Sequence, residues 1–141
     1  MKKVILLVMS IMLAVGTVCF AAGEGQNDST RTGMTAAYRQ ITPQEAKVRM
    51  DKNPSCIVLD VRSPEEYAAG HIPSAVLLPV EQIEAKADSV SQILPDKSAE
   101  IFVYCRSGKR AGRAAAALTE QGYTNVSSIG GIIDWPYEVV S

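Results

Sequence analysis

A cysteine followed by a run of cations is the part of this sequence most suited to chemistry. Cys105 closes the apolar stretch 101–104, and the segment Arg106 to Arg110 leads into an alanine-rich run. The apolar stretch predicts a buried strand and the alanines predict a helix. Because the free N–H groups and positive dipole end of a helix start favour an anion, Cys105 is expected to be a nucleophilic thiolate in an anion-binding loop.

The charges around this cysteine support the same interpretation. No acidic residue lies between Cys105 and Leu118, and four cations follow the thiol within nine residues: Arg106, Lys109, Arg110 and Arg113. Backbone N–H groups of residues 106–110 are expected to stabilise the thiolate. The alternative interpretation is a buried structural cysteine followed by a solvated, basic helix start.

The amino terminus has the pattern of a secretory signal peptide. Two lysines precede an apolar run that ends in small residues, so we expect a leader over residues 1–21, with cleavage near Ala21 to Gly23. We therefore expect a periplasmic or secreted protein with no stable membrane span after cleavage. Two alternatives stay open: an uncleaved stretch 4–22 is long enough to span a bilayer, and Cys19 could carry a lipid.

Composition limits the ligands. The formal net charge is −1, and loss of Lys2 and Lys3 with the leader leaves 12 basic against 15 acidic residues, a net charge near −3. A mildly acidic protein with a local basic cluster argues against nucleic acid and for a small anionic ligand. The sequence has no metal-ligand spacing and no nucleotide-binding loop, so neither a metal nor a cofactor is expected.

Strand and helix patterns alternate after a polar segment, residues 22–35, that we expect to be a flexible linker. Strands are expected at 38–41, 56–61, 75–78, 101–105 and 125–129. Helices are expected from Pro43 to near Asn53, from Pro64 to Gly70, over 81–87, from the loop after Cys105 to Gly122, and as one turn over 132–135. Gly130-Gly131 is expected to turn the chain after the last strand. This alternation predicts an α/β domain with a mostly parallel sheet.

The two cysteines outside the leader are not expected to form a disulfide. If their strands are parallel neighbours, Cys56 begins one and Cys105 ends the other, so about 16 Å separates them at ~3.3 Å per residue. That exceeds the ~7 Å limit for bridged Cα atoms. We therefore expect Cys105 to be a free thiol and Cys56 to lie in the core. Ligands bind at the carboxyl ends of parallel strands, where Cys105, Asp60 and Arg62 all fall.

Four blocks of the sequence resemble the signature blocks of the rhodanese family, in the same order and spacing. They are Leu59–Tyr67, Gly70–Pro73, Tyr104–Arg110, and Gly130–Ile132 with Trp135. The resemblance covers residues 38–141 and is strongest to small, single-domain, exported bacterial sulfurtransferases. It implies a three-layer α/β domain over residues 36–141, with a central sheet flanked by helices.

The resemblance also implies an activity, that of a thiosulfate sulfurtransferase. Cys105 matches the family's active cysteine, which takes the outer sulfur of thiosulfate as a persulfide and passes it to cyanide or a thiol. The matching loop, which would bind the substrate, consists of Arg106, Ser107, Gly108, Lys109 and Arg110. Asp60 and Arg62 are expected to support the loop through an ion pair or hydrogen bonds. His71, Trp135 and the Gly130-Gly131 pair are expected to be structural.

A cysteine loop of this kind also occurs in two other functional classes. Phosphatases and arsenate reductases on this fold place an arginine six residues after the cysteine, whereas Arg110 is five after Cys105, so the loop is one residue short for a phosphate-sized anion. A persulfide carrier or sensor without turnover needs the same loop, and the sequence leaves it open.

Overall fold

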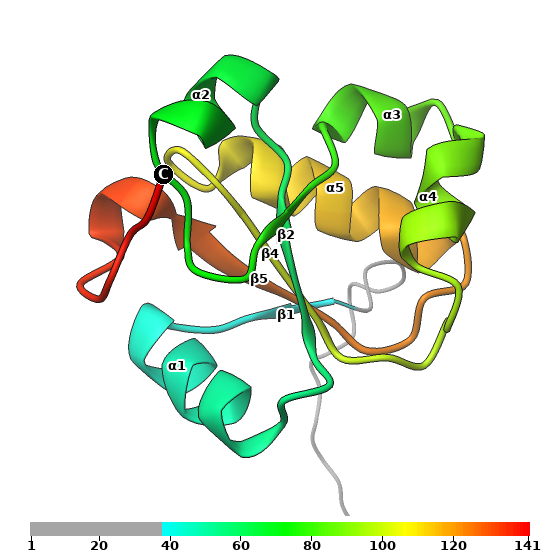
Figure 1. The fold of residues 1–141 in the computed structure, drawn as a ribbon. Coiled ribbons are helices and arrows are strands. Elements are labelled where there is room, and N and C mark those ends of the chain that lie inside the picture. Colours follow the sequence, from blue (N-terminus) through cyan, green and yellow to red (C-terminus); the bar gives the residue numbers. More distant parts are fainter. Residues whose placement is uncertain (1–37) are drawn as a thin grey trace, which may run out of the picture. The chain divides into compact units, whose positions relative to one another are not determined.

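The structure, a computed structural model, describes residues 38–141 and contains a five-stranded sheet whose neighbouring strands are all parallel (Figure 1). The strand order is β1-β5-β4-β2-β3. The strands are β1 (Arg39–Gln40), β2 (Ile57–Asp60), β3 (Val76–Leu77), β4 (Ile101–Cys105) and β5 (Val126–Gly131). The predicted α/β class with a parallel sheet is confirmed. The predicted leader and linker, residues 1–21 and 22–35, lie outside the described residues.

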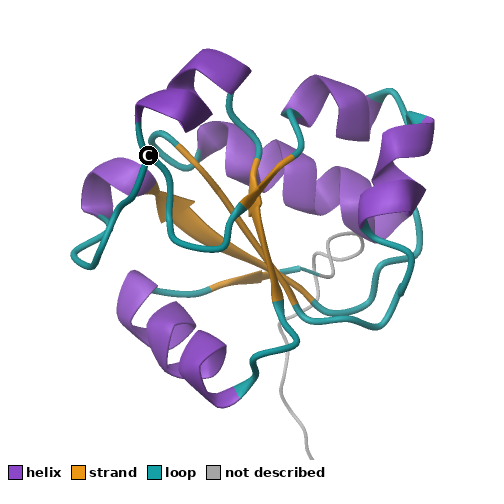
Figure 2. Cartoon of the chain, viewed as in Figure 1, coloured by secondary structure: helices purple, strands orange, loops and turns teal. Residues whose placement is uncertain are grey.

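Helices cover both faces of the sheet, which gives the three-layer arrangement seen in Figure 2. The helices are α1 (Pro43–Lys52), α2 (Pro64–Ala69), α3 (Val80–Glu84), α4 (Asp88–Ile93) and α5 (Lys109–Glu120), followed by a 3₁₀ turn at Ile132–Asp134. One buried cluster joins α3, α4 and α5 to the sheet, and a second joins α1 and Trp135 to its other face. Strand β4 lies in the middle of the sheet, and all five of its residues are buried.

Local sequence signals fix the starts of α1 and α2. The Thr42 hydroxyl accepts a hydrogen bond from the Glu45 N–H at 3.0 Å, and Pro43 occupies the first turn. Ser63 and Glu66 form a capping box, in which each side chain accepts a hydrogen bond from the other residue's backbone N–H. The predicted starts of these helices at Pro43 and Pro64 are confirmed. The hydroxyls and the carboxylate satisfy backbone N–H groups that have no partner within the helices.

Two expectations about the second half of the chain need correction. The helix predicted over 81–87 ends earlier, at Glu84, and a further helix, α4, forms in the polar segment after it, with Val90 buried against the core. The last strand was expected to end at Ile129 and turn at Gly130-Gly131. Instead β5 continues through Gly131, whose partner is Cys105 after a register shift in the ladder. At the other end of α5, Gly122 has the positive φ predicted for a residue just beyond a helix.

The strand register brings the functional candidates to one edge of the sheet. Strand β2 pairs with β4 so that Asp60 lies beside Tyr104, one residue before Cys105. The carboxyl ends of both strands therefore face the loops that precede α2 and α5. None of the helices in residues 38–141 combines the length and apolar character needed to cross a bilayer.

Two buried serines in β5 are exceptions to an otherwise satisfied core. In the part of the chain that the structure describes, the hydroxyls of Ser127 and Ser128 are buried and have no hydrogen-bond partner. A hydroxyl removed from water without a partner destabilises the folded state by about 1–3 kcal/mol.

We expect Ser127→Ala to leave the free energy of unfolding unchanged or to raise it by about 1 kcal/mol, because alanine keeps the packing and removes the unpaired hydroxyl. Ser63→Ala is the matched control. It removes the capping hydroxyl of α2 and should lower the same quantity by about 1 kcal/mol. Denaturant unfolding measures both. A marked loss of stability in Ser127→Ala would show that this hydroxyl is hydrogen-bonded in the folded protein.

Candidate active site

The Cys105 thiol lies where two backbone N–H groups converge. Its side chain ends β4, and the residue is 1% exposed. The sulfur accepts hydrogen bonds from the Gly108 N–H at 3.0 Å and from the Ala111 N–H at 3.3 Å. Two N–H donors aimed at one sulfur stabilise a negative charge there.

The helix start explains why these two groups are available. Helix α5 begins at Lys109, so Ala111 is in its first turn, where N–H groups have no partner inside the helix. Gly108 precedes the helix with φ +108°, a conformation that favours glycine, and this turns its N–H toward the sulfur. The positive end of the α5 dipole acts on the same atom.

The loop after Cys105 packs directly on the backbone of β5. The Arg106 carbonyl accepts a hydrogen bond from the Ile133 N–H at 3.2 Å. A Cβ at Gly131 would overlap the Arg106 carbonyl and the Ser107 Cα. The loop can therefore lie where it does only because position 131 has no side chain. Gly130-Gly131 is structural, as predicted, through a backbone contact.

A buried carboxylate supports the strand that carries the thiol. Asp60 is fully buried and pairs with the Arg62 guanidinium at 2.6 Å, so the expected ion pair is present. Asp60 also accepts hydrogen bonds from the Arg62 backbone N–H at 3.0 Å and from the Tyr104 hydroxyl at 2.7 Å. The carboxylate raises the pKa of Arg62, and burial raises the pKa of Tyr104 far above its usual value, so that both remain proton donors.

The same network reaches the turn after α2. Arg62 donates to the Gly70 carbonyl at 2.6 Å, and the Tyr104 hydroxyl accepts from the Ile72 N–H at 3.0 Å. His71 lies between Gly70 and Ile72 in the sequence, and its ring stacks on the ring of Tyr67 with centroids 3.8 Å apart. His71 is therefore a structural residue of this turn, as predicted.

Arg110 forms an ion pair with Glu66 that was not predicted from the sequence. Its guanidinium donates two hydrogen bonds to the Glu66 carboxylate, at 2.9 and 3.0 Å. Glu66 also accepts the Ser63 N–H of the capping box. Arg110, with a smaller contribution from Ser63, lowers the pKa of Glu66 from 4.5 to about 2, so the carboxylate is charged at neutral pH.

The other predicted loop residues lie at the surface. Arg106, Ser107 and Lys109 are exposed, and neither Arg106 nor Lys109 has an ion-pair partner within residues 38–141. The structure thus brings Gly108 to the sulfur and leaves two cations open to solvent near the same turn.

Four contributors to the site were not predicted for it: Ala111, Glu66, Tyr104 and Gly131. Ala111 had a usable signal, because it is the third residue of the helix that follows the cysteine. Glu66 had no such signal, because its pairing with Arg110 spans 44 positions of sequence. The contacts of Tyr104 and Gly131 depend equally on strand pairing, which single residues do not reveal.

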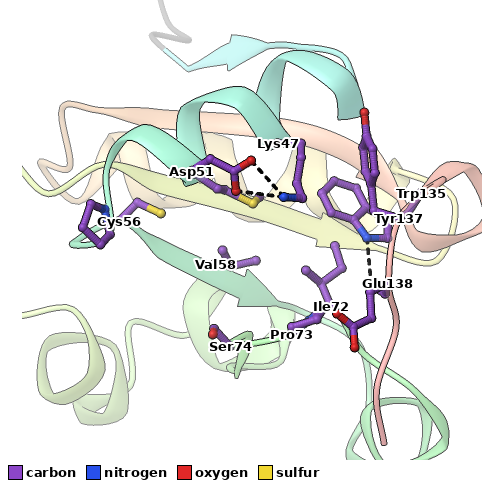
Figure 3. A pocket seen from close by; sticks show the side chains of 12 residues that line it. Lys47, Asp51, Cys56, Val58, Ile72, Pro73, Ser74, Trp135, Tyr137 and Glu138 are labelled. Atoms are coloured by element: carbon purple, nitrogen blue, oxygen red, sulfur yellow. Dashed lines mark hydrogen bonds and ion pairs between the residues drawn. The ribbon is translucent and has the colours of Figure 1, made fainter.

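Cys56 is less buried than predicted. It was expected to be in the core, but it is only partly buried and lines a cavity of about 380 Å³ between α1, β2 and the C-terminal segment (Figure 3). Burial raises the pKa of its thiol, which favours the unreactive form. Cys105 does not line this cavity, and both thiols are free. Within residues 38–141 no cluster of three or more His, Cys, Asp or Glu side chains is arranged to hold a metal.

Known proteins resemble this chain in sequence and in fold. The family model described as a rhodanese-like domain matches residues 42–136. The thiosulfate sulfurtransferase PspE of Escherichia coli is 36% identical over 76 residues, covering 54% of this chain and 70% of the relative. A sulfurtransferase of Allochromatium vinosum is 36% identical over 97 residues, covering 68% of this chain and 86% of the relative. The solved structure of a rhodanese with anions from E. coli has 33% identity and a TM-score of 0.55, covering 60% of this chain and 96% of that one.

We expect Gly131→Ala to displace the loop after Cys105, because the new Cβ would collide with backbone atoms that cannot move independently. The free energy of unfolding should fall by about 1–3 kcal/mol. Hydrogen exchange of the Gly108 and Ala111 amides should speed up as their bonds to the sulfur are lost.

Gly112→Ala is the control for this substitution. Its Cβ would make an ordinary contact with the Tyr38 hydroxyl at 3.5 Å, so stability should rise by about 1 kcal/mol from helix propensity, with those amides unaffected. Unchanged amide protection in Gly131→Ala would contradict the close approach.

The depressed pKa of Glu66 predicts a pH-dependent stabilisation. Because the folded-state pKa lies below the unfolded value of 4.5, the pair stabilises the fold fully above that pH and loses its effect as pH falls toward about 2. We expect the stability difference between the natural protein and Glu66→Gln to shrink across this window in denaturant unfolding. A constant difference from about pH 7 to about pH 3 would contradict the pairing.

Proposed function

The chain belongs to the rhodanese-like domain family and is a rhodanese-like sulfurtransferase, and we propose that it moves a sulfane sulfur from thiosulfate or a similar donor to cyanide or a thiol. The sulfur would be carried as a persulfide on Cys105. The observation that supports this most strongly is the convergence of the Gly108 and Ala111 N–H groups on the Cys105 sulfur. Those groups suit a sulfur atom that is negatively charged as the thiolate and that is bonded to the charged outer sulfur in the persulfide.

The first half-reaction loads the enzyme. The Cys105 thiolate attacks the outer sulfur of thiosulfate and forms a new S–S bond. The S–S bond within thiosulfate breaks, and its electron pair leaves on sulfite. A thiolate and a dianion thereby become a persulfide anion and a sulfite dianion, so charge and electrons balance and no oxidant is needed.

The second half-reaction returns the enzyme to its starting state. Cyanide or a thiolate attacks the outer sulfur of the persulfide, and the electron pair of the broken S–S bond stays on Cys105. The products are thiocyanate, or the persulfide of the acceptor, and the free thiolate. Sequential half-reactions of this kind give ping-pong kinetics.

The remaining loop residues have supporting roles in this proposal. The exposed cations Arg106 and Lys109 would attract the anionic donor, and Ser107 and Gly108 would form the turn that it meets. Arg110 would contribute through its pair with Glu66. Asp60 and Arg62 would act as positioning residues, since their network holds β2, β4 and the turn at Gly70 together.

We also propose that the protein works in the periplasm or is secreted. Support comes from the charged, then apolar, then small-residue pattern of residues 1–21. The intact mass of the protein purified from cells reports whether this segment has been removed. A full-length mass would overturn cleavage.

The test combines turnover with intact mass. With thiosulfate and cyanide, sulfite and thiocyanate should form continuously, and thiosulfate alone should add the mass of one sulfur atom to the protein. Cys105→Ser should abolish both effects, while Cys56→Ser is the matched control and should retain them, because Cys56 lines the separate cavity. Full activity in Cys105→Ser would overturn the proposal, and a single stoichiometric burst would instead identify a carrier.

A further inference from the structure

The Glu66–Arg110 pair is rigidly held at the rim of the Cys105 loop. Glu66 comes from α2 and Arg110 from the first turn of α5, and two hydrogen bonds of 2.9 and 3.0 Å join them. The Ser63 N–H holds the same carboxylate at 3.1 Å. Each side chain of the pair keeps 30% of its surface exposed, so its charge acts on molecules that approach the loop.

Arg110 also lies within electrostatic reach of the reacting sulfur. Glu66 is the main cause of the raised pKa of Arg110, but the charge that Cys105 can carry contributes as well. Glu81, which is exposed and forms no ion pair within residues 38–141, adds a weaker contribution. A change in the net charge of the pair would therefore be felt at the sulfur and at any ligand beside it.

The pair changes the charge that a sulfur donor meets. The loop carries three cations, but Glu66 offsets Arg110, which leaves Arg106 and Lys109 without ion-pair partners in the described part of the chain. Together with one thiolate, these two cations give a local charge of about one positive unit. Because the Coulomb energy scales with the charge of the donor, this lower positive charge weakens the attraction of a doubly charged donor more than that of a singly charged one.

We propose that Glu66 is a specificity-determining residue that offsets Arg110 and so lowers the preference of the site for doubly charged donors relative to singly charged ones. The class of donor that this favours is the thiosulfonates, in which one charged oxygen of thiosulfate is replaced by a carbon group. The inference rests on the proposed sulfur transfer at Cys105. The chemistry is the same with either donor: the thiolate attacks the outer sulfur, and sulfinate leaves in place of sulfite with the electron pair of the broken S–S bond.

The size of the effect follows from the charge of the donor. Within one solvent-exposed site, one added unit charge changes the interaction with a monoanion by about threefold in an equilibrium constant, and with a dianion by about tenfold. Removing the charge of Glu66 should therefore favour thiosulfate over methanethiosulfonate by about threefold. Added salt should weaken this difference.

The experiment compares kcat/KM for thiosulfate and methanethiosulfonate, with cyanide as the acceptor. Glu66→Gln adds one positive charge and keeps the cap of α2, because glutamine also serves in a capping box. Arg110→Gln removes one positive charge, and the double variant restores the neutral balance of the natural pair. Glu84→Gln is the matched control, since it removes the partner of Arg113 farther along the same helix.

Selectivity should follow net charge. The thiosulfate-to-methanethiosulfonate ratio should rise about threefold in Glu66→Gln, fall by a similar factor in Arg110→Gln, return to the natural value in the double variant, and stay unchanged in Glu84→Gln. A ratio that is the same in all variants, or one that is furthest from natural in the double variant, would overturn the role of Glu66 while leaving the sulfur transfer intact. Failure of the natural protein to turn over either donor would overturn the proposed function, and this inference with it.

Discussion

The buried carboxylate of Asp60 is the interaction on which the site depends. It accepts hydrogen bonds from the backbone and guanidinium of Arg62 and from the hydroxyl of Tyr104. An ionised group buried without partners is strongly destabilising, so these donors are a condition of the fold. Through them, β2 is joined to β4 beside Cys105, and Arg62 carries the connection on to Gly70. Loss of one partner would leave the others buried and unpaired.

That network makes the geometry at the sulfur possible. Cys105 follows Tyr104 directly, so the hydroxyl bond to Asp60 fixes the end of the strand from which the thiol projects. On the other side, the loop rests on the backbone of Gly131. With both sides fixed, the N–H groups of Gly108 and Ala111 are already oriented toward the sulfur. Such donors need no reorganisation when charge develops on the atom they face.

The parts of the molecule that the sequence predicted are those governed by nearby residues. Two examples are the helix starts at Pro43 and Pro64 and the cysteine at the end of an apolar strand, which depend on positions a few residues apart. The errors arose where distant segments decide. Helix α4 is held by burial of Val90 against the core, and β5 runs through Gly131 because the loop after Cys105 packs there. Likewise Arg110 was predicted to bind the substrate, and its pairing with Glu66 was not predicted because Glu66 comes from another helix.

Differences in burial separate the roles of three of the arginine ion pairs, those of Arg62, Arg110 and Arg113. Asp60 and Arg62 are almost completely buried, so their attraction is strong and their geometry rigid, which suits support of the strands. Arg113 and Glu84 are 51% and 38% exposed, where water and salt screen an ion pair until it contributes little. The side chains of Arg110 and Glu66 are each 30% exposed, which lies between these limits. They are held well enough to keep their place beside Cys105 and exposed enough for their net charge to act on an incoming anion. Of the three pairs, this one is placed to influence which donor reacts, because a fully buried pair is shielded from the substrate and a fully exposed one is screened.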